Sequence, residues 1–190
     1  MALDKELLAY LRAHREAARS GLLTWFSTQA RELPWRQDRT PYRTWVAEIM
    51  LQQTQVNTVV GYYDRFLKRF PDVATLADAD QGEVLKLWEG LGYYRRARAM
   101  HQAAREVMEY YAGRLPADVE ALQSLPGVGP YTAGAVASMA FGIAAPAVDG
   151  NVRRVMSRVL ALSTPKPAEL REAVELWIPE HDPGAFNEAL

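Results

Sequence analysis

The sequence contains no cysteine, and its three histidines, His14, His101 and His181, lie far apart along the chain. Without thiols these residues cannot form disulfides or thiolate metal sites, and they cannot supply a cysteine nucleophile. The isolated histidines do not have the spacing of zinc ligands. We therefore expect no metal and no other cofactor within these 190 residues.

Long apolar runs are also missing. No stretch reaches the roughly 18 apolar residues that span a bilayer. The first residues, MALDKELLAYLRAHREAARSG, lack the basic start, apolar centre and small-residue cleavage site of a secretory signal. We expect a cytoplasmic protein, associated with the nucleoid if bacterial, that has no membrane partner. A hydrophobic content of 49% is sufficient for a packed core.

The net charge is only −1, which argues against a strongly basic nucleic-acid binder, but the charge is unevenly distributed. Residues 168–190 carry six acids and one base, so residues 1–167 have 21 bases and 17 acids, a net +4. Arginines cluster in residues 95–105 and 153–158. These clusters could contact phosphates, or they could be ordinary solvated helix faces.

Alternating apolar and polar residues are absent, and every long segment repeats its apolar residues with a period near 3.6, which predicts an all-helical fold. The first two helices are expected to be separated at Ser20-Gly21, and Pro34 is expected to end the second. The predicted helices are 3–19, 22–31, 42–52, 56–70, 72–77, 81–89, 95–111, 118–125, 131–141, 152–162, 168–178 and 185–190.

One carboxylate, Glu48, lies in the apolar part of residues 45–56, which read WVAEIMLQQTQV. Desolvation disfavours the charged form of an acid, so we expect the pKa of Glu48 to be raised and its proton to be available near neutral pH. The alternative is a partly exposed helix glutamate beside the core. This stretch alone does not decide between a catalytic acid and a structural residue.

Two glycine-containing segments have features of binding loops. Residues 90–94 place two adjacent tyrosines in a loop, where they either fill the core or face a ligand. Residues 125–135, LPGVGPYTAGA, predict a helix-hairpin-helix over residues 118–141. Its glycines allow close approach of another chain, and the amides that begin the second helix suit a phosphate. A helical corner without a ligand is the alternative.

Asp149 is placed to cap the helix predicted at residues 152–162. Backbone N–H donors and the helix dipole would keep this carboxylate ionised. It could be a cap without chemistry. Together with Glu48, however, it could form a pair in which one carboxyl donates a proton and the other stabilises positive charge.

Four motifs, in this order and spacing, resemble the helix-hairpin-helix DNA glycosylases, in particular the A/G-mismatch-specific adenine DNA glycosylases. They are WVAEIMLQQTQV, WEGLGYYRRAR, LPGVGPYTAGA and AVDGNVRRV. The resemblance implies two helical lobes with double-stranded DNA in the cleft between them. It places residues 1–40 and 151–190 in one lobe and a helical barrel, residues 41–150, in the other.

The resemblance also implies an activity. Members of this branch act in base excision repair: they flip out an adenine mispaired with 8-oxoguanine or guanine and hydrolyse its N-glycosidic bond. By this match Glu48 protonates a ring nitrogen of the departing adenine, and Asp149 stabilises the oxocarbenium-like sugar or bonds to it transiently. Tyr131 and Asn151 support that site. We expect a monomer.

The same match assigns Arg31, Trp35 and Glu188 to the adenine pocket. The residues that it assigns to DNA contacts are Gln53, Thr54, Leu91, Tyr93, Gly127, Gly129, Arg36 and Arg153.

The chain departs from the family pattern beyond its last helix. The family places four cysteines, which hold an iron–sulfur (4Fe-4S) cluster, shortly after the position of Leu190, and then a domain that recognises 8-oxoguanine. We therefore expect a piece of a longer protein, with the cluster implied only for that longer protein, a frayed last helix around Glu188 and impaired activity.

Two other functions stay open. One is a bifunctional glycosylase/lyase of the endonuclease III type, which needs a lysine amine two residues after the second hairpin glycine. This chain has Tyr131 there, which favours a monofunctional enzyme. The other is a helix-hairpin-helix DNA-binding module without catalysis.

Overall fold

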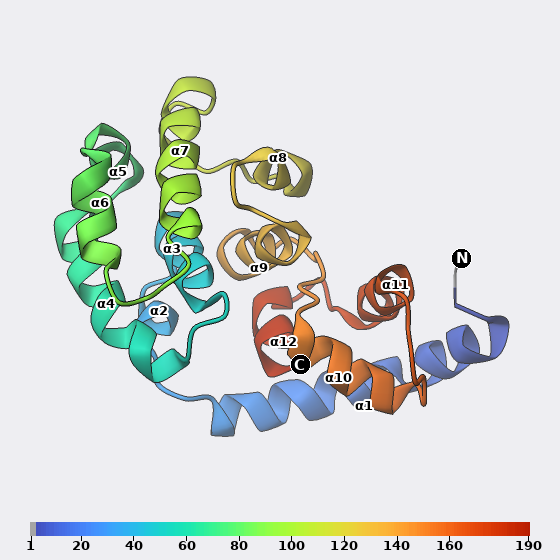
Figure 1. The fold of residues 1–190 in the computed structure, drawn as a ribbon. Coiled ribbons are helices and arrows are strands. Elements are labelled where there is room, and N and C mark those ends of the chain that lie inside the picture. Colours follow the sequence, from blue (N-terminus) through green and yellow to red (C-terminus); the bar gives the residue numbers. More distant parts are fainter. Residues whose placement is uncertain (1–2) are drawn as a thin grey trace. The chain divides into compact units, whose positions relative to one another are not determined.

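A computed structural model describes residues 3–190, which form twelve helices joined by short connections (Figure 1). No strand occurs in this range, and the all-helical prediction is confirmed. None of the helices in residues 3–190 has the length and apolar character needed to cross a membrane. The helices are α1 (Lys5–Gln29), α2 (Pro34–Gln37), α3 (Pro41–Leu51), α4 (Val56–Arg69), α5 (Val73–Asp78), α6 (Gln81–Trp88), α7 (Arg95–Tyr110), α8 (Val119–Ser124), α9 (Pro130–Phe141), α10 (Gly150–Val159), α11 (Pro167–Trp177) and α12 (Pro183–Ala189).

The chain divides into two compact units. One unit combines the N-terminal residues up to Arg31 with Ala137–Leu190, and the other is Glu32–Val136. We call them the terminal unit and the central unit. The chain passes from the central to the terminal unit within α9. The domain boundaries predicted at residues 40/41 and 150/151 stay a prediction.

The central unit is built around α3, which packs against α2, α4 and α7. Residues 44–50 of α3 are all buried, as expected of a helix that is apolar on nearly every side. An aromatic cluster supports the neighbouring helices: the ring of Phe66 makes edge-on contacts with Phe70 and Trp88, at centroid distances of 5.0 and 6.1 Å. The Glu48 side chain is thus held in the middle of a packed core.

The terminal unit has a separate apolar cluster formed by α1, α10, α11 and α12. Leu11, Met156 and Phe186 are fully buried in it. Arg19 fixes α1 to the end of α11, because its guanidinium donates to the carbonyl oxygens of Trp177 at 2.6 Å and Ile178 at 2.7 Å. A cation at this end of a helix satisfies carbonyls that have no partner within the helix.

Two helix predictions were wrong. Ser20-Gly21 does not end a helix, since α1 is continuous. One glycine in a helix interior costs only about 1 kcal/mol. Packing of Leu7 and Leu22 against the same apolar cluster favours continuity across that position. Pro34 does not end the preceding helix, since α1 ends at Gln29; instead Pro34 begins α2, where its fixed φ and missing N–H are tolerated at the first position.

The last helix also differs from the expectation of fraying. α12 begins with Asp182, whose side chain accepts a hydrogen bond from Ala185 N at 3.2 Å. Phe186 is fully buried, and Asn187 is nearly so. Tertiary packing therefore holds a helix that is too short to be stable by propensity alone.

Candidate active site

Glu48 is buried in α3, with only 6% of its surface exposed. This excludes the partly exposed glutamate that the sequence left open. Tyr131, in the first turn of α9, donates its hydroxyl to Glu48 Oε2 at 2.9 Å. Both residues belong to the central unit. The structure therefore brings together the predicted acid and a residue predicted to support it.

A carboxyl group at this position is suited to donate a proton. Removing a carboxylate from water is costly unless hydrogen bonds or charges compensate. The phenol of Tyr131 also fixes the direction of one carboxyl oxygen, so the group does not rotate freely. The raised pKa expected from the sequence stays a prediction.

Asp149 is the N-cap of α10, as predicted. Its Oδ1 accepts hydrogen bonds from Asn151 N and Val152 N, both at 2.8 Å, and its Oδ2 accepts one from Asn151 Nδ2 at 2.9 Å. Three donors and the positive end of the helix dipole stabilise a negative charge here. The structure therefore brings Asp149 and Asn151 together in the terminal unit.

Arg154, which the sequence interpretation placed only in a charge cluster, orients this cap. Its Nη2 donates to Asn151 Oδ1 at 3.0 Å. The amide of Asn151 thus bridges a carboxylate and a guanidinium, which fixes its rotamer. Arg153, the neighbour predicted to contact DNA, is exposed.

Asn187 is a second residue that sequence analysis missed, although it named the neighbouring Glu188. Asn187 Nδ2 donates to Ser138 Oγ at 2.8 Å and to Ala145 O at 2.9 Å, while its Oδ1 accepts from Ala147 N at 3.2 Å. All four residues belong to the terminal unit. The buried amide therefore fixes the segment that leads directly into Asp149.

A glycine allows α12 to approach this segment. A Cβ atom on Gly184 would lie 2.8 Å from Met139 Cα and 3.0 Å from Ser138 O, closer than side-chain carbons pack. The Pro183-Gly184-Ala185 sequence was a usable signal, because an interior glycine near a helix start often marks close backbone contact.

The predicted hairpin is present in the central unit between α8 and α9. Gly127 has a φ of +78°, which side chains disfavour, and a Cβ there would come within 2.8 Å of Ala99 Cβ in α7. Both the backbone conformation and the close contact therefore require glycine. Gly129 is exposed and immediately precedes Pro130, the first residue of α9. The assignment of these glycines to phosphate contacts stays a prediction.

Four of the residues predicted to contact DNA lie on two connections of the central unit. Gln53 follows α3, and Leu91 and Tyr93 follow α6. Gln53 and Tyr93 both have positive φ, 57° and 47°, and both are exposed, whereas Leu91 is buried. Thr54 accepts a hydrogen bond from Arg96.

Arg96 corrects the interpretation of the first arginine cluster. It is neither a solvated residue nor an exposed phosphate contact, because only 7% of its surface is exposed. The signal was present in the sequence: Arg96 lies one, two and three turns before Met100, Ala103 and Val107 on the buried face of α7.

The three residues assigned to the adenine pocket belong to different units. Arg31 is exposed after the end of α1, and Glu188 is half-buried in α12 of the terminal unit. Trp35 is buried in α2 of the central unit, with its ring 5.4 Å from that of Tyr63 in an edge-on arrangement. Arg36, the proposed backbone contact beside it, is half-buried. Their shared role stays a prediction.

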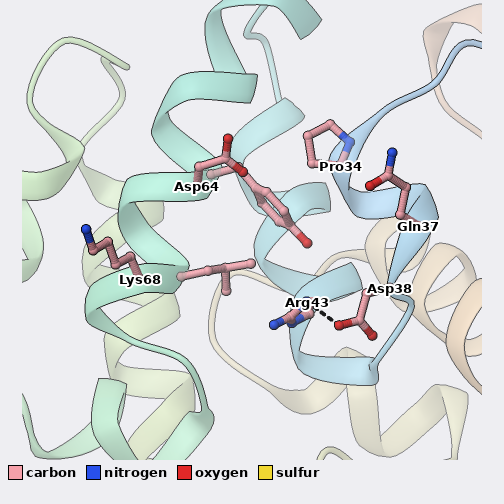
Figure 2. Close-up of a pocket in the computed structure, with 8 residues that line it drawn as sticks. Pro34, Gln37, Asp38, Arg43, Asp64 and Lys68 are labelled. Carbon is pink, nitrogen blue, oxygen red and sulfur yellow. Dashed lines mark hydrogen bonds and ion pairs between the residues drawn. The ribbon is translucent and has the colours of Figure 1, made fainter.

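A pocket in the central unit involves other residues (Figure 2). Figure 2 shows two of its lining residues, Asp38 and Arg43, side by side as an ion pair. Burial raises the pKa of Tyr63, which also lines the pocket, to about 12, so its hydroxyl stays protonated at neutral pH. No sequence-predicted site residue lines this pocket, which is formed by Pro34, Gln37, Asp38, Arg43, Tyr63, Asp64, Leu67 and Lys68.

The residues present do not fit an iron–sulfur cluster. Such clusters are held by cysteine thiolates, and the sequence has none. Within residues 3–190, no group of three or more histidine, aspartate or glutamate side chains is placed to hold a metal ion. The candidate site offers carboxyl, hydroxyl, amide and guanidinium groups for chemistry.

Several known proteins are similar to this chain. It is 45% identical over 188 residues to the adenine DNA glycosylase of Homo sapiens, an alignment that covers 91% of this chain and 34% of that protein. It is 40% identical over 173 residues to the adenine DNA glycosylase of Buchnera aphidicola subsp. Baizongia pistaciae, covering 89% of this chain and 49% of the relative. The chain thus spans half or less of the length of these relatives.

Solved structures show the same fold. A thermostable thymine-DNA glycosylase matches with a TM-score of 0.82 and 30% identity, over 93% of this chain and 86% of that one. A trapped endonuclease III–DNA covalent intermediate matches with a TM-score of 0.79 at 24% identity, over 94% of this chain and 83% of that one. Residues 46–180 match the family described as HhH-GPD superfamily base excision DNA repair proteins. The chain therefore belongs to the HhH-GPD superfamily.

Proposed function

We propose that this chain is the catalytic part of an adenine DNA glycosylase, a base-excision-repair enzyme that removes adenine mispaired with 8-oxoguanine or guanine. The observation that carries the proposal is the buried carboxyl of Glu48, held by the hydroxyl of Tyr131 in a chain that closely resembles proteins of that name. Double-stranded DNA with a mispaired adenine is the proposed partner, and the proposed state is a monomer.

The two carboxyl groups divide the reaction between them. Glu48 donates its proton to a ring nitrogen of the flipped adenine, and the electron pair of the glycosidic bond leaves with the base. The sugar becomes an oxocarbenium-like cation, which the negative charge of Asp149 stabilises. Water then adds to the sugar carbon and loses a proton, so the products are adenine and an abasic site.

The supporting residues keep the two groups in place. Tyr131 orients Glu48, and Asn151 orients Asp149 through the hydrogen bond to Oδ2. Arg31, Trp35 and Glu188 are proposed to line the adenine pocket. The iron–sulfur cluster is proposed only for a longer protein, and no step of this mechanism depends on it.

Contacts to DNA are proposed at three places. The amides around Gly127 and Gly129 meet a phosphate at the start of α9, where the dipole of a helix of 12 residues favours an anion. Arg36 and Arg153 meet the backbone as cations. The exposed Gln53 and Tyr93, with Thr54 and Leu91, open the base stack and touch the base opposite adenine.

A monofunctional enzyme is favoured over a glycosylase/lyase. Schiff-base chemistry needs an amine, and Tyr131 offers a phenol that already donates to Glu48. We therefore expect no covalent complex when the protein is incubated with abasic DNA and borohydride. Efficient trapping would overturn the assignment of a hydrolytic reaction.

Single-turnover adenine release tests the proposed function. Excess protein at low salt is mixed with duplexes that carry adenine opposite 8-oxoguanine, guanine or thymine. We expect release from the first two duplexes and none from the third. Residues 1–190 should act more slowly than a version extended by the cysteine-bearing segment that the resemblance implies. Absence of release by both versions, with DNA binding intact, would favour a binding module instead.

A further inference from the structure

The Arg96 guanidinium donates six hydrogen bonds within the central unit. It lies in the first turn of α7, and all of its acceptors are neutral oxygens. Nη1 donates to Ile49 O and Met50 O, both at 2.9 Å, and to Gln52 O; Nη2 donates to Thr54 Oγ1 at 3.1 Å, Leu91 O at 3.2 Å and Gly92 O at 3.3 Å.

These acceptors belong to two separate segments, the end of α3 with the residues that follow it and the loop after α6. Ile49 and Met50 are in the last turn of α3, whose final carbonyls have no partner within the helix and form the negative end of its dipole. Leu91 and Gly92 belong to the loop after α6. The two Nη groups of the planar guanidinium bridge the two segments, which a lysine amine with three donors on one atom would reach less completely.

Both segments contain an exposed residue in a left-handed backbone conformation. Gln53 is enclosed between Gln52 and Thr54, two residues that accept from Arg96. Tyr93 directly follows Gly92, and its ring centroid lies 5.6 Å from the guanidinium carbon. Residues with a side chain rarely adopt positive φ, so surrounding contacts must maintain both conformations.

We propose that Arg96 is a positioning residue that holds Gln53 and Tyr93 together in their left-handed conformations, so that both enter the base stack of a DNA duplex as one rigid unit. This inference rests on the proposed function. Burying a cation among neutral carbonyls costs desolvation free energy, so Arg96 is a poor choice for stabilising the core alone. A need to hold two loop residues rigidly explains why a buried arginine is present. The acceptors of Arg96 include neither Glu48 nor Tyr131, so its contribution lies in opening the duplex and not in transferring the proton.

The test separates duplex opening from bond cleavage. Adenine release is measured in single turnover on a duplex with one adenine opposite guanine, and on the same strands with the mispair inside a bubble of unpaired neighbours. We expect Arg96→Met to slow release from the duplex by about 100-fold, since small misplacements have effects of that size. Release from the bubble, where the bases are already unstacked, should fall by no more than about threefold.

A readout without chemistry keeps this test independent of the proposed activity. In a Glu48→Gln background, 2-aminopurine placed beside the mispair reports unstacking by its fluorescence. At saturating protein, Glu48→Gln should raise the fluorescence, and Glu48→Gln with Arg96→Met should not. An increase without adenine release by the wild-type chain would support the inference and refute the proposed function.

Further variants cover the case that Arg96→Met does not fold. Thr54→Val keeps the shape of the side chain and removes one hydroxyl, which accepts from Arg96 and donates to Gln52 O at 3.3 Å. It should preserve helicity by circular dichroism and lower the duplex rate several-fold more than the bubble rate. Arg96→Lys should have a ratio of duplex to bubble rates between those of Arg96→Met and the wild type. Arg95→Met removes an exposed guanidinium from the same turn of α7 and should leave that ratio unchanged.

The inference is overturned if folded Arg96→Met and Thr54→Val slow release from duplex and bubble by the same factor, because that is the behaviour of a general loss of structure. Unstacking fluorescence in the Arg96→Met double variant equal to that of Glu48→Gln alone would also overturn it.

Discussion

The two carboxyl groups of the proposed mechanism are placed by opposite means. Glu48 is in the middle of a buried helix, and its hydrogen-bond donor, Tyr131, is 83 positions away in the sequence. Asp149 is half-buried at a helix start, and its donors are two and three positions away. The environment of the buried acid thus depends on tertiary packing, whereas the hydrogen-bond donors of the capping acid come from the residues that follow it in the sequence.

This contrast suits the two proposed roles. A group that gives up a proton must hold it first, and exclusion of water favours the neutral carboxyl. A group that stabilises a cation must stay ionised, and N–H donors at a helix start favour the charged form. Substitutions at one site at a time test whether the two carboxyl groups have these different roles.

The largest effect is expected at Glu48. Glu48→Gln keeps the shape of the side chain but cannot donate an acidic proton, so adenine release should fall by about 10³-fold or more. Duplex binding should stay within about threefold, because the residue is buried and contributes no charge to the surface. Single-turnover kinetics and a binding titration measure the two quantities. Near-normal release would mean that another group supplies the proton.

A smaller loss is expected at Asp149. Asp149→Asn retains an acceptor for the cap but removes the negative charge beside the sugar, so release should fall by about 10²-fold. Asp118→Asn is the matched control, because Asp118 caps α8 and accepts from Ala121 N at 2.8 Å. If both variants slow release equally, Asp149 is a cap without chemistry.

Tyr131→Phe tests the link between the buried acid and its distant partner. Loss of one hydrogen bond, worth about 1.4 kcal/mol, should slow release about tenfold while the fold is preserved. Tyr110→Phe is the control, since Tyr110 is exposed on α7. A rate unchanged in Tyr131→Phe would show that packing alone orients Glu48.

The smallest kinetic effect is expected at Asn187, although its effect on stability should be clear. Asn187→Ala leaves Ala147 N and Ala145 O without their side-chain partner, and unsatisfied buried groups should lower the free energy of unfolding by about 3 kcal/mol. Release should slow several-fold as the segment before Asp149 loosens. Urea unfolding measures the free energy of unfolding of Asn187→Ala, and the control is Asn57→Ala, which changes an exposed asparagine in α4. Equal stability of the two variants would contradict this account.

The sequence predicted well what is determined locally. The caps at Asp72, Asp80, Asp118 and Asp149 are each followed by the predicted helix, because a cap needs only donors within three residues. The continuity of α1 was not predictable in this way, because it depends on an apolar cluster contributed mainly by residues more than 100 positions away.

The same distinction applies within the candidate site. The burial of Glu48 followed from its apolar neighbours, but the Tyr131 hydroxyl, the amide of Asn187 and the guanidinium of Arg96 act across long sequence separations. A buried polar residue on the apolar face of a predicted helix is the usable signal, and Arg96 carries it on α7. Its acceptors could not be inferred, because they are mostly backbone carbonyls that any residue can offer.

The most direct test of the central claim, that Glu48 supplies the proton, is the pH dependence of single-turnover adenine release at saturating protein. In the wild type, the rate constant should fall as the pH rises and Glu48 loses its proton, while Asp149→Asn should keep the same high-pH decline at a lower rate. In Glu48→Gln, the residual rate should no longer decline with the same midpoint. An unchanged midpoint in Glu48→Gln would contradict the account.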